Sequence, residues 1–186
     1  MTKQELLKEY ELIKRAQRDK NAFAPLYEKY FVFVFRFVYK RVGDKDLTND
    51  LTSQTFVNAM MHIQKFEFRG VSLSPWLIRI AINEVNKHFR TARKQHHVSI
   101  DENQMAQLSD DVDLAHHHAS MEQLVEALNE LDDNDQQLIE LRYFEQLSFK
   151  EMSVMYNASE AALKMKVYRL LDRMKKRLEQ KRSSSS

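Results

Sequence analysis

The 186-residue sequence contains no cysteine, two glycines and two prolines. The absence of cysteine excludes disulfide bonds and thiolate metal sites, and it fits the reducing interior of a cell. Glycine and proline usually supply about 7% and 5% of residues, so this chain has little material for the tight turns that connect β-strands. Its content of hydrophobic residues, 43%, is nevertheless sufficient for buried cores. We therefore expect an all-α fold of one or two domains.

Long apolar segments are also missing. No apolar run approaches the roughly 18 residues that span a bilayer, and the polar start of the chain, Met1 to Glu5, lacks a signal core. We therefore expect a soluble, cytoplasmic protein with no direct membrane insertion.

The charge is distributed unevenly, although the formal net charge is only +2. Residues 22–95 hold 12 Lys/Arg and 6 Asp/Glu, and residues 163–182 hold 9 and 2. Residues 96–120 hold no Lys/Arg and 5 Asp/Glu, and they show no hydrophobic periodicity. This pattern predicts two basic modules joined by a flexible acidic linker.

A helix-turn-helix is predicted near the C-terminus. Ser148 and Glu151 have the spacing of a capping box, and Asn157 suits the left-handed conformation that ends a helix. A second helix from Ser159 repeats apolar residues with a period of 3.6. These are Leu163, Val167, Leu170, Leu171, Met174 and Leu178. Its other face is basic, which suits DNA, but lysine-rich amphipathic helices are common and this pattern alone does not decide the function.

Helices are also predicted in the first half of the chain, one of them at residues 47–65. Residues 3–20 should be a helix with Leu6, Leu7, Tyr10 and Ile13 on its apolar side. Residues 31–39 have the composition of a strand, but they lack turn residues and have helical flanks, so we expect a helix there as well.

A loop at residues 66–75 precedes a predicted helix at residues 76–94, with Pro75 suited to its first turn. The loop brings aromatic residues, and the helix brings Asn83, Lys87 and Arg90. Stacking faces, amides and positive charges together are typical of single-stranded DNA recognition. The alternative is that Trp76 and Phe68 belong to the core.

The order and spacing of these motifs resemble those of extracytoplasmic-function (ECF) sigma factors, small members of the sigma-70 family that contain regions 2 and 4. The matching elements in region 2 are Leu26-Tyr27, Tyr30, Asp50-Leu51, Phe56, Phe68-Arg69-Gly70 and Trp76 to Asn83. Those in region 4 are Leu128, Leu131, Leu141 to Glu145, Leu147 to Met152 and Ser159 to Arg169.

The resemblance implies a two-domain bacterial protein. Region 2 would occupy residues 1–95, the linker 96–120, region 4 residues 121–182 and a disordered tail 183–186. The implied partners are core RNA polymerase (its β′ clamp and β subunit), promoter DNA and an anti-sigma factor. The implied function is promoter recognition, promoter melting and transcription initiation, without a cofactor.

The resemblance also assigns residues to each contact. Core-polymerase binding falls to Asp50, Leu51 and Phe56. Binding of the minus-10 element falls to Phe68, Arg69, Ser72, Leu73, Trp76, Asn83, Lys87 and Arg90. Binding of the minus-35 element falls to Ser148, Lys164, Met165, Lys166, Tyr168, Arg169 and Arg173. The sequence departs from the family pattern at Ser53-Gln54, Met165 and Lys166, and lysine cannot make the bidentate contact to guanine that arginine makes.

Two other functions remain open at this stage. A helix-turn-helix regulator that acts without polymerase would explain residues 121–182, and a helical adaptor would use the apolar stripes to bind partner helices. An enzyme is not expected, because the chain has no glycine-rich phosphate loop and no catalytic set at motif spacing. Histidines 96, 97 and 116–118 lie in a polar segment, and we expect no metal site there.

Overall fold

The computed structural model describes residues 2–92, 108 and 121–184, and every regular element in this part of the chain is a helix. It confirms the all-α class. The chain divides into two compact units, Met1–Ser99 and Ile100–Ser186, and each is described by itself.

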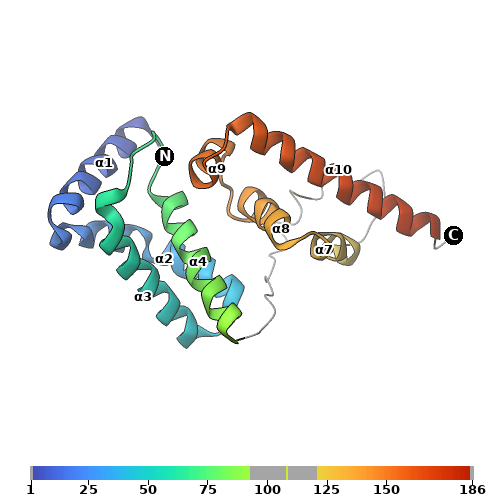
Figure 1. The fold of residues 1–186 in the computed structure, drawn as a ribbon, viewed down its shortest axis with the longest axis horizontal. Coiled ribbons are helices and arrows are strands. Elements are labelled where there is room, and N and C mark those ends of the chain that lie inside the picture. The colour runs from blue at the N-terminus through green and yellow to red at the C-terminus, as the bar shows by residue number, and fades with distance from the viewer. Residues whose placement is uncertain (1, 93–107, 109–120, 185–186) are drawn as a thin grey trace. The chain divides into compact units, whose positions relative to one another are not determined.

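Residues 2–92 of the first unit form four α-helices, α1 to α4 (Figure 1). Helices α2, α3 and α4 pack against one another, and α1 packs on α2 and on the short turn that follows α3. The bounds are α1 (Lys3–Arg18), α2 (Ala24–Val42), α3 (Lys45–His62) and α4 (Ser74–Ala92), with 3-10 turns at Lys20–Phe23 and Ile63–Lys65.

The strand-like run lies within α2, as predicted. Val34, Phe37 and Val38 are fully buried, because α2 packs against α1, α3 and α4. The Arg36 side chain is exposed to solvent and does not enter the core. Tertiary burial here outweighs the β propensity of individual residues.

Both glycines of the chain occupy the left-handed region, where other residues are strained. Gly43 has φ 70° and ends α2, its N–H donating to the Tyr39 carbonyl at 2.8 Å. Gly70 has φ 71° in the loop before α4. The few glycines are thus used where the backbone requires them.

The second unit contains the predicted helix-turn-helix. Ser148 and Glu151 form the capping box, Asn157 ends the first helix with φ 51°, and the predicted apolar stripe of the second helix is buried. The elements are α7 (Met121–Asn129), α8 (Asp133–Ile139), a π turn (Glu140–Phe144), α9 (Phe149–Tyr156) and α10 (Glu160–Ser184). Helix α10 ends at Ser184 and so overlaps the first two residues of the tail at 183–186, whose disorder stays a prediction.

The predicted linker, residues 96–120, lies outside the described residues except for Leu108, which is buried. Among the helices that the structure describes, none has the length and apolar character needed to cross a membrane.

Helix α3 buries three threonines, and one of them offers a stability test. The hydroxyls of Thr48 and Thr55 donate to the carbonyls of Asp44 (2.6 Å) and Leu51 (2.7 Å). The buried Thr52 hydroxyl has no hydrogen-bond partner within the described chain. Replacing Thr52 with valine should therefore raise the free energy of unfolding by about 1 kcal/mol, because an unsatisfied buried group is removed at similar shape.

Urea unfolding of the full chain would measure this gain. Thr55→Val is the matched control, since its hydroxyl is bonded, and it should show no gain. Equal changes in both variants would contradict the argument.

Candidate nucleic-acid interfaces

Helix α4 presents one polar, basic face. Asn83, Lys87 and Arg90 are all exposed, and their spacing of four and three places them on the same side of the helix. The only carboxylate in the α4 sequence, Glu84, is half-buried and accepts a hydrogen bond from Asn58 Nδ2 at 2.8 Å. This hydrogen bond joins Glu84 of α4 to α3.

The aromatic residues of the neighbouring loop are packed against other rings. Phe66 is buried and meets the half-buried Trp76 edge to face, with ring centroids 5.2 Å apart. The half-buried Phe68 stacks on Tyr10 of α1 at 4.4 Å. Phe68 and Trp76 are therefore partly core residues, as the alternative interpretation expected. Only part of each ring is accessible for stacking with a base.

Helix α1 holds both ends of this loop. At the first end, Gln17 Nε2 donates to the carbonyls of Ile63 (3.0 Å) and Phe66 (2.8 Å). At the second end, the Leu73 backbone N–H donates to Glu9 Oε1 at 2.7 Å. The loop is therefore fixed to a helix more than forty residues earlier in the sequence.

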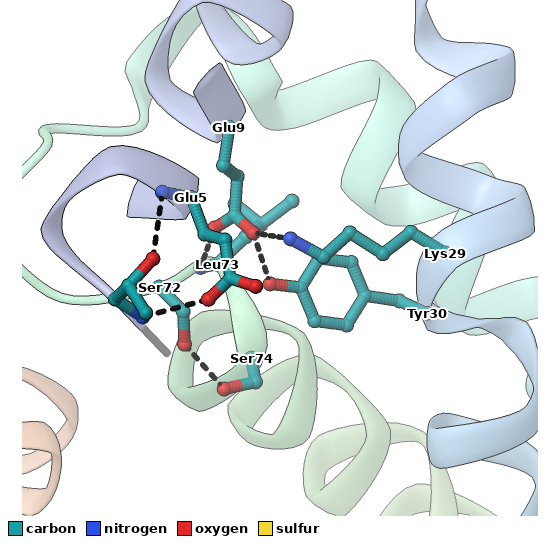
Figure 2. Close-up of polar contacts among 8 residues, drawn as sticks. Glu5, Glu9, Lys29, Tyr30, Ser72, Leu73 and Ser74 are labelled. Carbon is teal, nitrogen blue, oxygen red and sulfur yellow. Dashed lines mark hydrogen bonds and ion pairs between the residues drawn. The ribbon is translucent and has the colours of Figure 1, made fainter. Parts of the chain in front are cut away.

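Glu9 is the centre of a buried polar cluster (Figure 2). Its Oε1 accepts from Leu73 N–H, while its Oε2 accepts from the Tyr30 hydroxyl at 2.5 Å and from the Lys29 ammonium. Burial, together with the hydrogen bond to Glu9, raises the pKa of Tyr30 far above its ordinary value. The Tyr30 hydroxyl consequently stays protonated and acts as the donor.

Beside this cluster, the half-buried hydroxyls of Ser72 and Ser74 lie 2.6 Å apart and share a hydrogen bond. Arg69, whose side chain is half exposed, forms an ion pair with Glu67 at 3.2 Å. Arg69 is thus on the accessible side of the loop.

Three predicted contact residues have little or no exposed surface. Leu73 is fully buried, and Leu51 and Phe56 are also buried, so their assignment as contacts stays a prediction. The Phe56 ring packs against Tyr27 at 4.8 Å. All three side chains pack in the interior of the first unit. Among the predicted polymerase contacts, only Asp50 is exposed.

The predicted minus-35 residues on α10 lie together on its surface. Lys164, Met165, Lys166, Tyr168 and Arg169 are all exposed, whereas the intervening Val167 is fully buried. The Lys164 ammonium lies 5.5 Å above the Tyr168 ring. A single helix face therefore offers charge and an aromatic surface.

Ser148, the other predicted contact, is exposed at the start of α9. Its hydroxyl donates to Glu151 Oε2 at 2.7 Å and accepts from the Glu151 N–H at 3.2 Å. The capping box therefore already uses this hydroxyl.

Two of the predicted contact residues are joined by a carboxylate. Asp135 of α8 is buried and accepts from Lys166 Nζ and from Arg173 Nη2, both at 2.9 Å. Burial alone would raise the pKa of Asp135, but the hydrogen bonds and charges of Lys166 and Arg173 outweigh it and lower the pKa. Asp135 thus fixes part of the basic face of α10 to α8.

Glu9 and Asp135 were missed by sequence reasoning. Glu9 shares a helix face with Ile13 and Ala16, both buried, and a carboxylate within such a stripe was the available signal. The predicted apolar face of this helix included Leu7, which is 54% exposed and therefore wrongly placed. Asp135 gave no comparable signal, because acidic residues at a helix start are common.

No group of three or more His, Asp or Glu residues within the described ranges could hold a metal ion. The histidines at 96, 97 and 116–118 lie outside those ranges.

Comparison with known families gives two matches. Residues 26–95 match the family model of Sigma-70 region 2, and residues 121–174 match that of Sigma-70 region 4. Helix α1 precedes the first matched range.

Curated relatives carry the same pattern. The chain is 34% identical over 164 residues to the ECF RNA polymerase sigma factor BldN of Streptomyces coelicolor, covering 86% of this chain and 61% of that one. It is 32% identical over 152 residues to the ECF RNA polymerase sigma factor SigM of Bacillus subtilis, covering 81% and 91%. The chain thus spans less than two thirds of the length of BldN but most of SigM.

Solved structures share the fold. CnrH in complex with the cytosolic domain of CnrY matches with a TM-score of 0.58 at 19% identity, covering 92% of this chain and 97% of that one. The sigma factor RpoE of Bartonella quintana, in complex with the anti-sigma factor NepR, matches with a TM-score of 0.52 at 20% identity, covering 84% and 96%.

Proposed function

This chain belongs to the ECF sigma factors of RNA polymerase, and from this premise we propose that it binds core RNA polymerase and directs it to promoters. The observation that carries the proposal is the presence, in two separate units, of a helix whose exposed face is basic: α4 with Asn83, Lys87 and Arg90, and α10 with Lys164 to Arg169. One unit would take the minus-10 element and the other the minus-35 element.

The first unit is suited to unpaired DNA. The exposed amide of Asn83 can bond a base edge, while Lys87 and Arg90 neutralise phosphates on the same face. The partly accessible rings of Phe68 and Trp76 offer stacking surface nearby in the sequence. Promoter melting would then be driven by the binding of extruded bases and the displaced strand, with no covalent chemistry and no enzymatic activity.

The second unit is suited to duplex DNA. Helix α10 follows a short turn that begins at Asn157, which is the arrangement of a recognition helix that enters the major groove. Arg169 can make a bidentate contact to guanine, whereas Lys164 and Lys166 contribute as point charges. Ser148 and Arg173 would add contacts to DNA phosphates at the edge of this interface.

The partners follow from these surfaces. Core polymerase, through its β′ clamp, would meet the side of the first unit that carries the exposed Asp50, and the β subunit would meet the second unit. An anti-sigma factor is a further proposed partner, because the similar structure of RpoE is bound to one. The proposed location is the bacterial cytoplasm, where promoter DNA lies.

A helix-turn-helix regulator that works without polymerase is the second candidate. It explains α9 and α10 equally well, but it leaves the Sigma-70 region 2 match at residues 26–95 without a role.

Transcription in vitro tests the proposal. Core polymerase of the source bacterium would be incubated with fragmented genomic DNA, with and without this protein, and RNA 5′ ends would be mapped. Discrete starts that appear only with the protein would support a sigma factor and supply its promoter motif. Specific DNA binding without new starts would favour the regulator.

Single substitutions then test the residue assignments. Asn83→Ala and Arg169→Ala should each reduce promoter-specific transcripts about tenfold, the size expected when one base contact is lost. Asn134→Ala and Arg18→Ala remove the same groups from exposed positions elsewhere and should leave transcript levels near wild type. Full activity of the first pair would refute the assigned contacts.

A further inference from the structure

We infer that Glu9 is a positioning residue for the loop at residues 66–74, the capture loop, and that base selection at the minus-10 element depends on it without any contact between Glu9 and DNA. The inference rests on the proposed function and extends it to α1, which lies outside the matched range 26–95.

The first argument is burial. The Glu9 side chain has no exposed surface, and a carboxylate is costly to remove from water unless several donors compensate it. All of its donors come from other elements: Lys29 and Tyr30 from α2, and the Leu73 N–H from the end of the capture loop. Figure 2 shows Glu9 between these groups, with both oxygens engaged.

The second argument is the position of the bond. Leu73 lies between Ser72 and Ser74, whose hydroxyls bond each other at 2.6 Å, and α4 begins at Ser74. A bond to the Leu73 N–H therefore fixes the point where the loop passes into the helix that carries Asn83. Since contact geometry must hold within a few tenths of an ångström to discriminate bases, this point determines how loop and helix are presented together.

The third argument is that α1 holds the loop at three places. Gln17 binds its first end through Ile63 and Phe66, Tyr10 stacks on Phe68 in its middle, and Glu9 binds its last part. A loop anchored along its whole length by one helix is presented in one preferred shape.

Glu9→Gln tests the inference sharply because the amide cannot replace both oxygens. Its carbonyl can accept either from Leu73 or from the Tyr30 and Lys29 pair, and its NH₂ group then faces a donor on the other side. Glu11→Gln is the matched control: it makes the same change on the same helix at a side chain that is 64% exposed and paired with Lys14.

The first measurement is hydrogen exchange in the full, free chain. Glu9→Gln should speed exchange of the Leu73 amide about tenfold or more, because the one remaining carbonyl oxygen cannot serve both Leu73 and the Tyr30 and Lys29 pair, while amides of α2 and α3 keep their protection. Glu11→Gln should match wild type. Unchanged exchange at Leu73 would overturn the positioning role.

The second measurement is promoter opening by the holoenzyme on a promoter from the transcript mapping and on its single-base minus-10 variants. Glu9→Gln should lower the rate of promoter opening about tenfold. It should also reduce the ratio of opening rates between the matched promoter and its single-base variants, while the affinity for core polymerase stays unchanged. Tyr30→Phe removes a single donor to Glu9. It should reduce the same ratio of opening rates, but by a smaller factor.

Wild-type selectivity in Glu9→Gln, or equal losses on every promoter variant together with weaker core binding, would overturn the inference in favour of a merely structural role. A wild-type protein that starts no transcripts would overturn the proposed function and the DNA part of this inference with it. Exchange at Leu73 would still report whether Glu9 holds the loop.

Discussion

Replacing Val167 with aspartate is expected to unfold the second unit while the first stays folded. Val167 is fully buried in the stripe by which α10 packs on α7, α8 and α9. A carboxylate at this position would be buried without a partner, which costs about 3 to 5 kcal/mol, a large part of the stability of a small domain. Hydrogen exchange on the full chain would show lost protection in residues 121–184 and retained protection in residues 2–92.

Tyr168→Asp is the matched control. It adds the same negative charge one residue later, at a side chain that is 52% exposed. This variant should keep its protection from hydrogen exchange and lose only affinity for duplex DNA. Comparison of the two variants therefore separates the effect of unfolding from the effect of the added charge. Retained folding in Val167→Asp would show that α10 is not held by its apolar stripe.

The second large effect is expected at Asp135. Asp135→Asn removes the charge that Lys166 and Arg173 share, and it should lower the free energy of unfolding by about 1 to 3 kcal/mol. It should also release Lys166 to DNA, so that the salt dependence of duplex binding steepens by about one phosphate contact. Asp133→Asn, an exposed change on the same helix, controls for the helix dipole and should alter neither property strongly.

The pH dependence has a defined sign. Because its two cationic partners lower the pKa of Asp135 in the folded state, the ion pairs stabilise the protein above the unfolded pKa of about 4. This stability is lost as pH falls through the folded pKa. The difference in unfolding free energy between wild type and Asp135→Asn should therefore be full at pH 7 and should shrink below pH 4. A constant difference across this range would contradict the ion-pair explanation.

The helices could be predicted from sequence because their signals are local. Ser148 and Glu151 gave the start of α9, Asn157 gave its end, and the apolar repeat from Leu163 to Leu178 gave the buried face of α10. The lack of turn residues and the helical flanks predicted a helix for the run in α2, in spite of its β-branched and aromatic residues. Each of these features depends on residues close to one another in the sequence.

Sequence reasoning gave least where exposure depends on distant segments. Leu51, Phe56 and Leu73 were matched to contact positions by motif, but their side chains are buried by packing between helices. Glu9 was not assigned to the site because its donors lie 20 to 64 residues away along the chain. No local pattern states which donors will surround a carboxylate, so a buried polar cluster is visible only in the folded protein.

The π turn at Glu140–Phe144 bears on how this unit tolerates changes in length. The Glu145 N–H bonds the carbonyl of Glu140 at 3.0 Å, five residues earlier, so the turn holds one residue more than an α-helical turn. Leu141, Tyr143 and Phe144 are all buried there, a set wider than one α-helical face. Loss of one residue at this place would convert the π turn into an α turn. The helix-turn-helix that follows would then keep its register although the chain before it is one residue shorter.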